Sequence, residues 1–349
     1  MKLDFVGTYA FNRSLQVNSA GLQRELSKVQ TELATGRVAD IGSALGYQTS
    51  RSVNLEAQID LFDQIKSFNG VLTNRLTTMQ DAMNSIVDGA NGFMGEMGAA
   101  IGGHMDRSVL QGFGDKLLGT VTQFANATFN GEYVFSGVNT DVKAVIDFQG
   151  ADWDAAKQEI EDAFQAHFGF ASSDAQAATI TKTDMETFID GPYADLFNDT
   201  NWNQMWSGAS DRGVRSRISS REIVENPVTA NDAGFRKVVS AGVLLQFMAG
   251  TSAGGNALNA AAESAMTQSA NGLNDLANSQ GRLGVIEQRV SDAQDRIAIQ
   301  KNLLNEQLNS LIGVDQYEVA TRLNQLVINL EASYAASSKI QSLSLMNYL

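Results

Sequence analysis

The chain has 349 residues, a net charge of −14 and no cysteine. The negative charge argues against nucleic acid as a partner, because duplex binding depends on clustered Lys and Arg that neutralise phosphates. The lack of cysteine excludes disulfides, thiolate metal sites and thiol catalysis. The sequence contains no run of 18 apolar residues, which a membrane-spanning helix would need, and the segment 1–5 lacks the apolar core of a cleaved signal peptide. We therefore expect a protein that is cytoplasmic or exported without a cleaved signal peptide.

The N-terminal third has helical patterning. Residues 1 to about 12 show no clear period and predict a loose arm, after which a helix is expected from about Ser14 to Thr35, with Gly36 as its stop. A second helix is expected from about Ser50 to Ala100, and its length favours a coiled coil or helical bundle. Apolar residues follow heptad spacing in both helices: Leu22, Leu26, Val29 and Leu33 in the first, and Leu72, Leu76, Met79, Met83, Ile86, Ala90, Phe93 and Met97 in the second.

The middle of the chain is less regular. A third helical pattern between Leu110 and Phe124 is predicted to turn back along the second helix. Alternation in 132–135 and 141–146 then predicts two strands, and a further strand is expected at 214–218. Short amphipathic helices lie between them, such as the one that carries Trp153 and Phe164. Residues 131–231 are therefore expected to form a mixed α/β domain inserted into the helical part.

Helical patterning returns at Asn231, the expected cap of a helix that ends near Gly250, and residues 251–255 predict a hinge-like loop. A long helix should then run to Ile312, with Gly313 as a break and Asp315 as the cap of a final helix. The long helix repeats Leu276, Leu283, Val290, Ile297, Leu304 and Leu311 every seven residues, and the final one carries Val319, Leu323, Leu326, Leu330 and Ile340.

These patterns predict a mainly α fold, in which a long antiparallel helical-bundle or coiled-coil rod is built from both termini. We expect residues 1–130 and 232–349 to form the two halves of the rod and residues 131–231 to form the insert. The intramolecular seam of the rod is assigned to Leu72, Leu76, Met79, Met83, Ile86, Leu276, Leu283, Val290, Ile297, Leu304 and Leu311.

No constellation of side chains suggests catalysis, a cofactor or a metal. His104 and His167 lack helical ligand partners, and the acidic residues between Asp184 and Asp199 do not have the spacing of a calcium loop. Gly112-Phe113-Gly114 resembles a nucleotide loop only superficially, because no strand precedes it. The acidic chain contains one basic cluster, formed by Arg212, Arg215, Arg217 and Arg221. These charges either prevent an edge strand from pairing with other strands or contact a neighbouring copy of the chain.

The C-terminal segment is apolar where a monomer usually has a polar, frayed end, which indicates a partner. We assign an assembly or chaperone-binding segment to Tyr334, Ile340, Leu343, Leu345, Met346, Tyr348 and Leu349.

Three segments carry a resemblance to a known family: Asn12 to Val38, Gly131-Glu132-Tyr133-Val134-Phe135-Ser136-Gly137, and Leu330 to Leu349. Together they resemble the flagellin superfamily, and within it more closely the hook-associated protein 3 type of hook–filament junction protein. Two segments depart from the pattern: Ala39 to Gly46 carries a single acid, and Asn139 to Lys143 replaces a proline-rich continuation. Flagellin, the filament subunit, is the alternative.

The resemblance implies a structural, non-enzymatic subunit of the extracellular bacterial flagellum. Its expected partners are other copies of itself, the hook-side junction protein and flagellin, and a chaperone that covers the C-terminal segment before export by the flagellar type III apparatus. It implies no cofactor.

Overall fold

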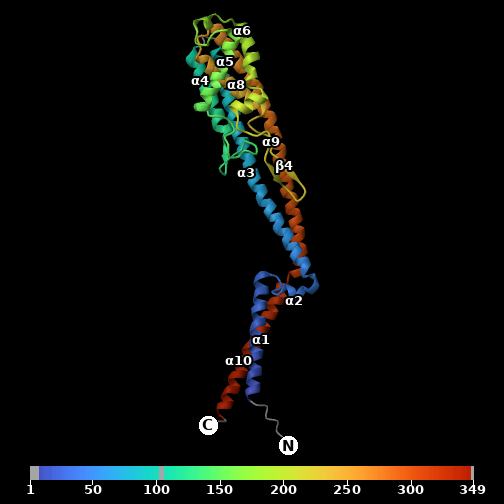
Figure 1. Ribbon diagram of the computed structural model, residues 1–349. Coiled ribbons are helices and arrows are strands. Elements are labelled where there is room, and N and C mark those ends of the chain that lie inside the picture. The colour runs from blue at the N-terminus through green and yellow to red at the C-terminus, as the bar shows by residue number, and fades with distance from the viewer. Residues whose placement is uncertain (1–7, 102–105, 347–349) are drawn as a thin grey trace. The chain divides into compact units, whose positions relative to one another are not determined.

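The computed structural model describes residues 8–101 and 106–346, with side chains placed for 13–101 and 106–339 (Figure 1). The predicted mainly α fold, with long helices packed against one another, is confirmed. The contacts divide the chain into two compact units, which are described separately: unit 1 comprises residues 1–64 and 296–349, and unit 2 comprises residues 65–295. The division into 1–130, 131–231 and 232–349 stays a prediction.

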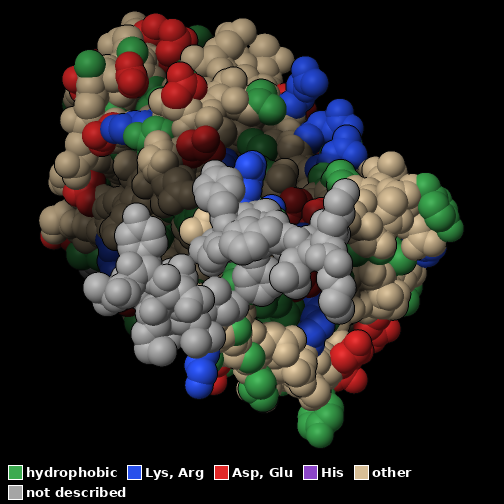
Figure 2. All heavy atoms as spheres, turned by 90° about the horizontal axis from the view of Figure 1, so that it is seen from below, with side chains coloured by type: hydrophobic (Ala, Val, Ile, Leu, Met, Phe, Trp, Pro, Cys, Tyr) green, Lys and Arg blue, Asp and Glu red, His purple; other side chains and the backbone are tan. Residues whose placement is uncertain are grey.

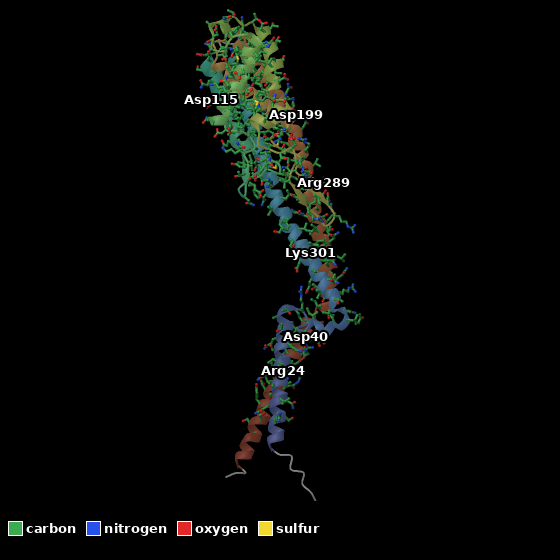
Figure 3. All side chains as sticks on the ribbon, in the orientation of Figure 1. Arg24, Asp40, Asp115, Asp199, Arg289 and Lys301 are labelled. Atoms are coloured by element: carbon green, nitrogen blue, oxygen red, sulfur yellow. The ribbon has the colours of Figure 1, made fainter. Side chains whose placement is uncertain are left out.

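Four helices form the framework of unit 2: α3 (Thr49–Ala100), α4 (Arg107–Ala125), α8 (Ala233–Ala249) and α9 (Gly255–Ile312), of which α3 and α9 extend into unit 1. Each helix runs antiparallel to its neighbours. Lys116 of α4 pairs with Glu96 of α3, Gln246 of α8 donates to Asp115 of α4 at 2.9 Å, and the Gln80 side chain of α3 donates to the Gln280 carbonyl of α9 at 3.1 Å (Asp115 is labelled in Figure 3). Unit 2 therefore contains an antiparallel four-helix bundle.

Helix α8 is the most deeply buried helix of this bundle. Twelve of its residues are buried, among them Phe235, Val239 and Leu244. A helix that buries most of its surface needs neighbours on most sides. Glycines let the neighbours approach: a Cβ at Gly114 of α4 would lie 2.9 Å from backbone atoms of α8, and one at Gly272 of α9 would lie 3.1 Å from the Gly234 carbonyl.

The chain between α4 and α8 packs onto the bundle as part of the same apolar cluster. It contains β1 (Thr128–Phe129), β2 (Glu132–Tyr133), α5 (Ala151–Phe168), η2 (Ala175–Thr179), α6 (Lys182–Phe188), η3 (Ile189–Tyr193), α7 (Asp199–Asn201), η4 (Trp202–Trp206), β3 (Arg215–Arg217) and β4 (Ile223–Glu225). Phe164 of α5 lies 6.0 Å from Phe247 of α8 between ring centroids, and the buried Tyr193 hydroxyl donates to the Ser240 carbonyl at 2.6 Å. Aromatic side chains therefore fasten this region to α8.

Two strand predictions need correction. Strand β2 ends at Tyr133 and pairs antiparallel with β1, and no strand occupies 141–146 apart from a bridge between Val145 and Ser207. Side chains satisfy the backbone of this segment in place of a neighbouring strand. Asn126 accepts from the Val145 N–H and donates to its carbonyl, both at 3.0 Å, and Ser207 donates to the Ala144 carbonyl at 2.8 Å. The strand predicted at 214–218 is present as β3, which pairs antiparallel with β4.

The loop between α8 and α9, predicted to be hinge-like, is firmly held. Arg107 donates to the carbonyls of Thr251 at 2.8 Å and Ala253 at 2.7 Å, and both of these residues are buried. Ser252 N–H donates to the Ser172 carbonyl at 2.8 Å. The cap prediction also moves by one residue, because α8 begins after Asp232, while Asn231 joins the side chains of Trp202, Ser207 and Asp211 instead.

Unit 1 contains α1 (Thr8–Thr35), α2 (Ile41–Leu45), η1 (Gly46–Gln48), the start of α3, the end of α9, and α10 (Gln316–Met346). The first helix begins earlier than predicted, since 8–12 belong to it, while residues 1–7 lie outside the described part. A small core joins α3 to α9 through Leu55, Leu308 and Ile312, and Lys301 pairs with Asp63 at 2.5 Å (Figure 3).

Candidate assembly surface

Helices α1 and α10 of unit 1 run antiparallel, side by side (Figure 1). Ser19 and Ser333 hydroxyls meet at 3.0 Å, and Gln23 donates to the Tyr334 hydroxyl at 2.6 Å. Among the described heptad residues of this pair, Val29 and Val319 are buried, and the rest are half-buried: Leu22, Leu26, Leu33, Leu323, Leu326 and Leu330. Among the described residues, each of these helices packs mainly against the other, so the seam stays partly open.

Both helices break at the same level of unit 1. Gly36 follows α1 with φ +67°, a left-handed conformation that glycine adopts without strain, and Gly313 lies between α9 and α10. The backbone at these breaks is paired: Val38 N–H donates to the Ile312 carbonyl at 2.9 Å, and Val314 N–H donates to the Gly36 carbonyl at 3.0 Å. The segment that follows α1 and the segment that precedes α10 are thereby joined beside the helix pair.

Glu32 fixes this joint, and a charge near the end of a helix is the only sign of it in the sequence. One of its oxygens accepts the Ala39 N–H at 3.2 Å, and the other pairs with Arg322 of α10. Its side chain is only 12% exposed. Asp315, as predicted, caps α10 by accepting the Tyr317 N–H at 2.8 Å.

Large apolar side chains lie exposed on this unit. On the helix pair, Val17 is 60% exposed, Ile328 58%, Tyr334 48% and Val327 38%. Single exposed apolar residues are ordinary, but several on a pair whose seam is already half open leave little buried surface to hold it. Figure 2, the view from below, shows apolar side chains among acidic and basic ones. The α1–α10 pair is the candidate assembly surface.

The residues assigned to the rod seam separate by unit. Unit 2 buries Leu76, Met79, Met83, Ile86, Leu276, Leu283 and Val290, and leaves Leu72 half-buried; in unit 1, Ile297 is buried while Leu304 and Leu311 are half-buried. The assignment of one seam to all of them stays a prediction.

Of the predicted assembly segment, only Tyr334 has a described side chain, which contacts α1. The side chains of Ile340, Leu343, Leu345 and Met346 lie outside the described residues, as do Tyr348 and Leu349 altogether.

The candidates for chemistry are placed in structural roles. His167 packs against Phe168 and Phe188, while His104 lies outside the described residues. Gly114 is an α4 packing residue rather than part of a loop. The described residues contain no group of three His, Asp or Glu placed to hold a metal. Among the helices that the structure describes, none combines the length and apolar composition of a membrane-spanning segment.

Comparison with known proteins gives two matches to family models. Residues 6–140 match the bacterial flagellin N-terminal helical region, and residues 265–349 match the bacterial flagellin C-terminal helical region, which together account for well over half of the chain. Between the two matches, residues 141–264 are not covered by either model. No curated protein matches the chain.

Among solved structures, one provisionally described as a flagellar hook-associated protein from Vibrio parahaemolyticus is similar, with a TM-score of 0.51 and 11% sequence identity. The alignment covers 77% of this chain and 99% of that one. At this identity the likeness shows a shared fold.

Proposed function

The chain belongs to the flagellin family, and we propose that, as a structural subunit of the bacterial flagellum, it occupies the junction between hook and filament. In this role its copies form a short zone that adapts the hook side to the filament. The hook-side junction protein would contact it on one side and flagellin on the other.

The observation that carries the proposal is the half-open seam of the α1–α10 pair. Val29 and Val319 are its only fully buried apolar residues among the described side chains, while Val17 and Ile328 are more than half exposed. Burying apolar surface contributes about 25 cal/mol for each Å², so further copies that cover this pair would stabilise it. A subunit that completes its terminal helices only in an assembly fits a polymer.

The choice of the junction over the filament rests on the sequence of the C-terminal segment. Ser344-Leu345-Met346-Asn347-Tyr348-Leu349 resembles the ending of junction proteins more than the Asn- and Gln-rich ending typical of flagellins. Flagellin remains the alternative, since both family models describe flagellin regions.

The same segment supports a proposal about export. Its apolar residues need cover before assembly, so we expect a type III export chaperone to bind 334–349 and the subunit to leave the cell without a cleaved signal peptide.

A deletion strain tests the junction role. We expect cells without this protein to build hooks and to release flagellin into the medium, because the filament lacks its adaptor. Electron microscopy of the cells and an immunoblot of the medium measure both effects. Normal filaments on the hooks of the deletion strain would contradict the junction assignment.

Immunogold labelling of sheared flagella distinguishes the alternative. A label confined to one end of the filament supports the junction, whereas a label along the entire filament identifies the chain as the filament subunit.

A further inference from the structure

A groove of about 390 Å³ in unit 2 combines apolar side chains with two arginines, Arg75 and Arg217, and one acid, Glu132. Its floor is the face of α3 that carries Phe68 and Val71, and its walls are the two hairpins, represented by Phe129 of β1 and Arg217 of β3. Phe68 is 70% exposed and Val71 is 48% exposed. An exposed aromatic ring in a concave setting, flanked by other apolar groups, has the form of an anchor site.

The walls of the groove are fixed before anything binds. Asn69 of α3 donates to the Ile218 carbonyl beside β3 at 2.9 Å, and Arg75 pairs with Glu132 of β2 at 2.5 Å. Arg289 of α9 holds the β3–β4 hairpin through Glu222 at 3.0 Å (Figure 3). A preformed groove loses little conformational entropy when a partner docks.

The groove borders the basic cluster that the sequence singled out. Within the described residues, Arg212 and Arg221 make no side-chain hydrogen bond or ion pair, Arg217 donates only to the Ser220 carbonyl at 3.1 Å, and the pair of Arg215 with Glu225 is long, at 4.0 Å. This cluster therefore keeps most of its charge available.

We propose that this groove docks a second copy of the chain, whose acidic surface faces the arginines and whose apolar side chain covers Phe68. The charge favours this partner, because the whole chain carries −14 while residues 211–225 hold four arginines against three acids. Arginines whose only role is to prevent an edge strand from pairing with another strand need no apolar groove beside them. The inference rests on the proposed function as an assembling subunit, and it names one contact within a larger interface.

The lack of native cysteine makes the contact directly testable. We introduce Phe68→Cys into the full chain, with Val142→Cys as the control, since Val142 is 44% exposed and lines a different groove with no residue in common. Both thiols should react readily with a maleimide in the free protein. In sheared flagella, the thiol of the Phe68→Cys variant should react at least about tenfold more slowly, as expected for a covered interface residue, while the control is unchanged.

A benzophenone-maleimide on the same thiol identifies the occupant. Crosslinking in assembled flagella should give a dimer of this chain. A crosslink to any other flagellar protein overturns the proposal, and so does an unprotected Phe68→Cys thiol in a variant that is incorporated normally.

Charge reversal gives an independent readout. Arg217→Glu should reduce incorporation into flagella at least about tenfold, whereas Lys157→Glu, the same charge change on the exposed face of α5, should not. Equal incorporation of both variants contradicts the docking. Absence of the wild-type chain from flagella contradicts the proposed function instead.

Discussion

Gly114 lies where α4 crosses α8, and the crossing leaves no room for a side chain. A Cβ there would be 2.9 Å from both the Gln246 nitrogen and the Gly242 carbonyl oxygen, which are backbone atoms that cannot swing aside. We expect Gly114→Ala to lower the free energy of unfolding by about 1–3 kcal/mol, the usual effect of overpacking. Chemical denaturation followed by circular dichroism measures it.

The matched control is on the same helix. Gly119 has nothing within 4 Å of its Cβ position, so Gly119→Ala should stabilise the protein by up to about 1 kcal/mol through helix propensity. The same effect from both substitutions would mean that α4 and α8 do not approach closely at Gly114.

Asp232 makes unit 2 sensitive to pH. Burial raises the pKa of its carboxyl, against the hydrogen bond from Ser279 and the pairing with Arg282, which lower it. An acid with a raised pKa holds its proton more tightly in the folded state than in the unfolded state. The contribution of Asp232 to the free energy of unfolding is therefore fully present below the unfolded pKa near 3.8, and it is lost as pH rises through the folded pKa. In the Asp232→Asn variant, the free energy of unfolding should decrease less between the unfolded and the folded pKa of this residue. Denaturation at a series of pH values measures it.

Arg282→Met supplies the opposite change. Losing the cation that lowers the pKa of Asp232 should extend the same fall to higher pH. If neither substitution altered the pH dependence, Asp232 would not be its source.

At the scale of elements, α1 and α10 depend on Glu32. Its carboxylate joins the residue after the α1 break to Arg322 of α10 in a site that is mostly shielded from water. We expect Glu32→Ala to destabilise the pair by about 1–3 kcal/mol, as for hydrogen bonds to a charged group. Amide hydrogen exchange along α10 should accelerate accordingly, while Glu25→Ala on the exposed side of α1 should have little effect. Unchanged hydrogen exchange in the Glu32→Ala variant would show that Glu32 does not stabilise the pair.

The long helices could be predicted from sequence because their apolar residues recur at heptad spacing and prolines lie only in the middle, at Pro192 and Pro227. The irregular region could not be predicted in detail, because Asn126 and Ser207 replace a strand partner with side-chain hydrogen bonds. The deep burial of α8 does not follow from a heptad pattern, although its glycines and its apolar run from Val238 to Met248 are a signal of it. For the assembly surface, sequence indicated the seam, but the link from Glu32 to Arg322 joins residues 290 apart, which no local pattern reveals.

For the whole molecule, the two units differ in how much they bury. Unit 2 holds one large apolar cluster, while the described core of unit 1 is small. We expect removal of Tyr334 to Leu349 to leave the thermal unfolding of unit 2 unchanged and to abolish incorporation into flagella, measured by circular dichroism and by immunoblot of sheared flagella. Tyr334→Phe, which loses only the hydroxyl that accepts from Gln23, should still be incorporated. Unfolding of unit 2 in the truncated chain would place the segment in the monomer core instead.

The contact between Ser19 and Ser333 spans 314 positions of the chain. Closing so long a loop costs entropy that the half-buried seam of this pair offsets only weakly, whereas the Gln80–Gln280 contact of α3 and α9, once formed, shortens the remaining loop. The order of folding should therefore run from the middle outward, with the terminal helices pairing last. A chain that emerges N-terminus first carries α1 without its partner until the final helix has been synthesised.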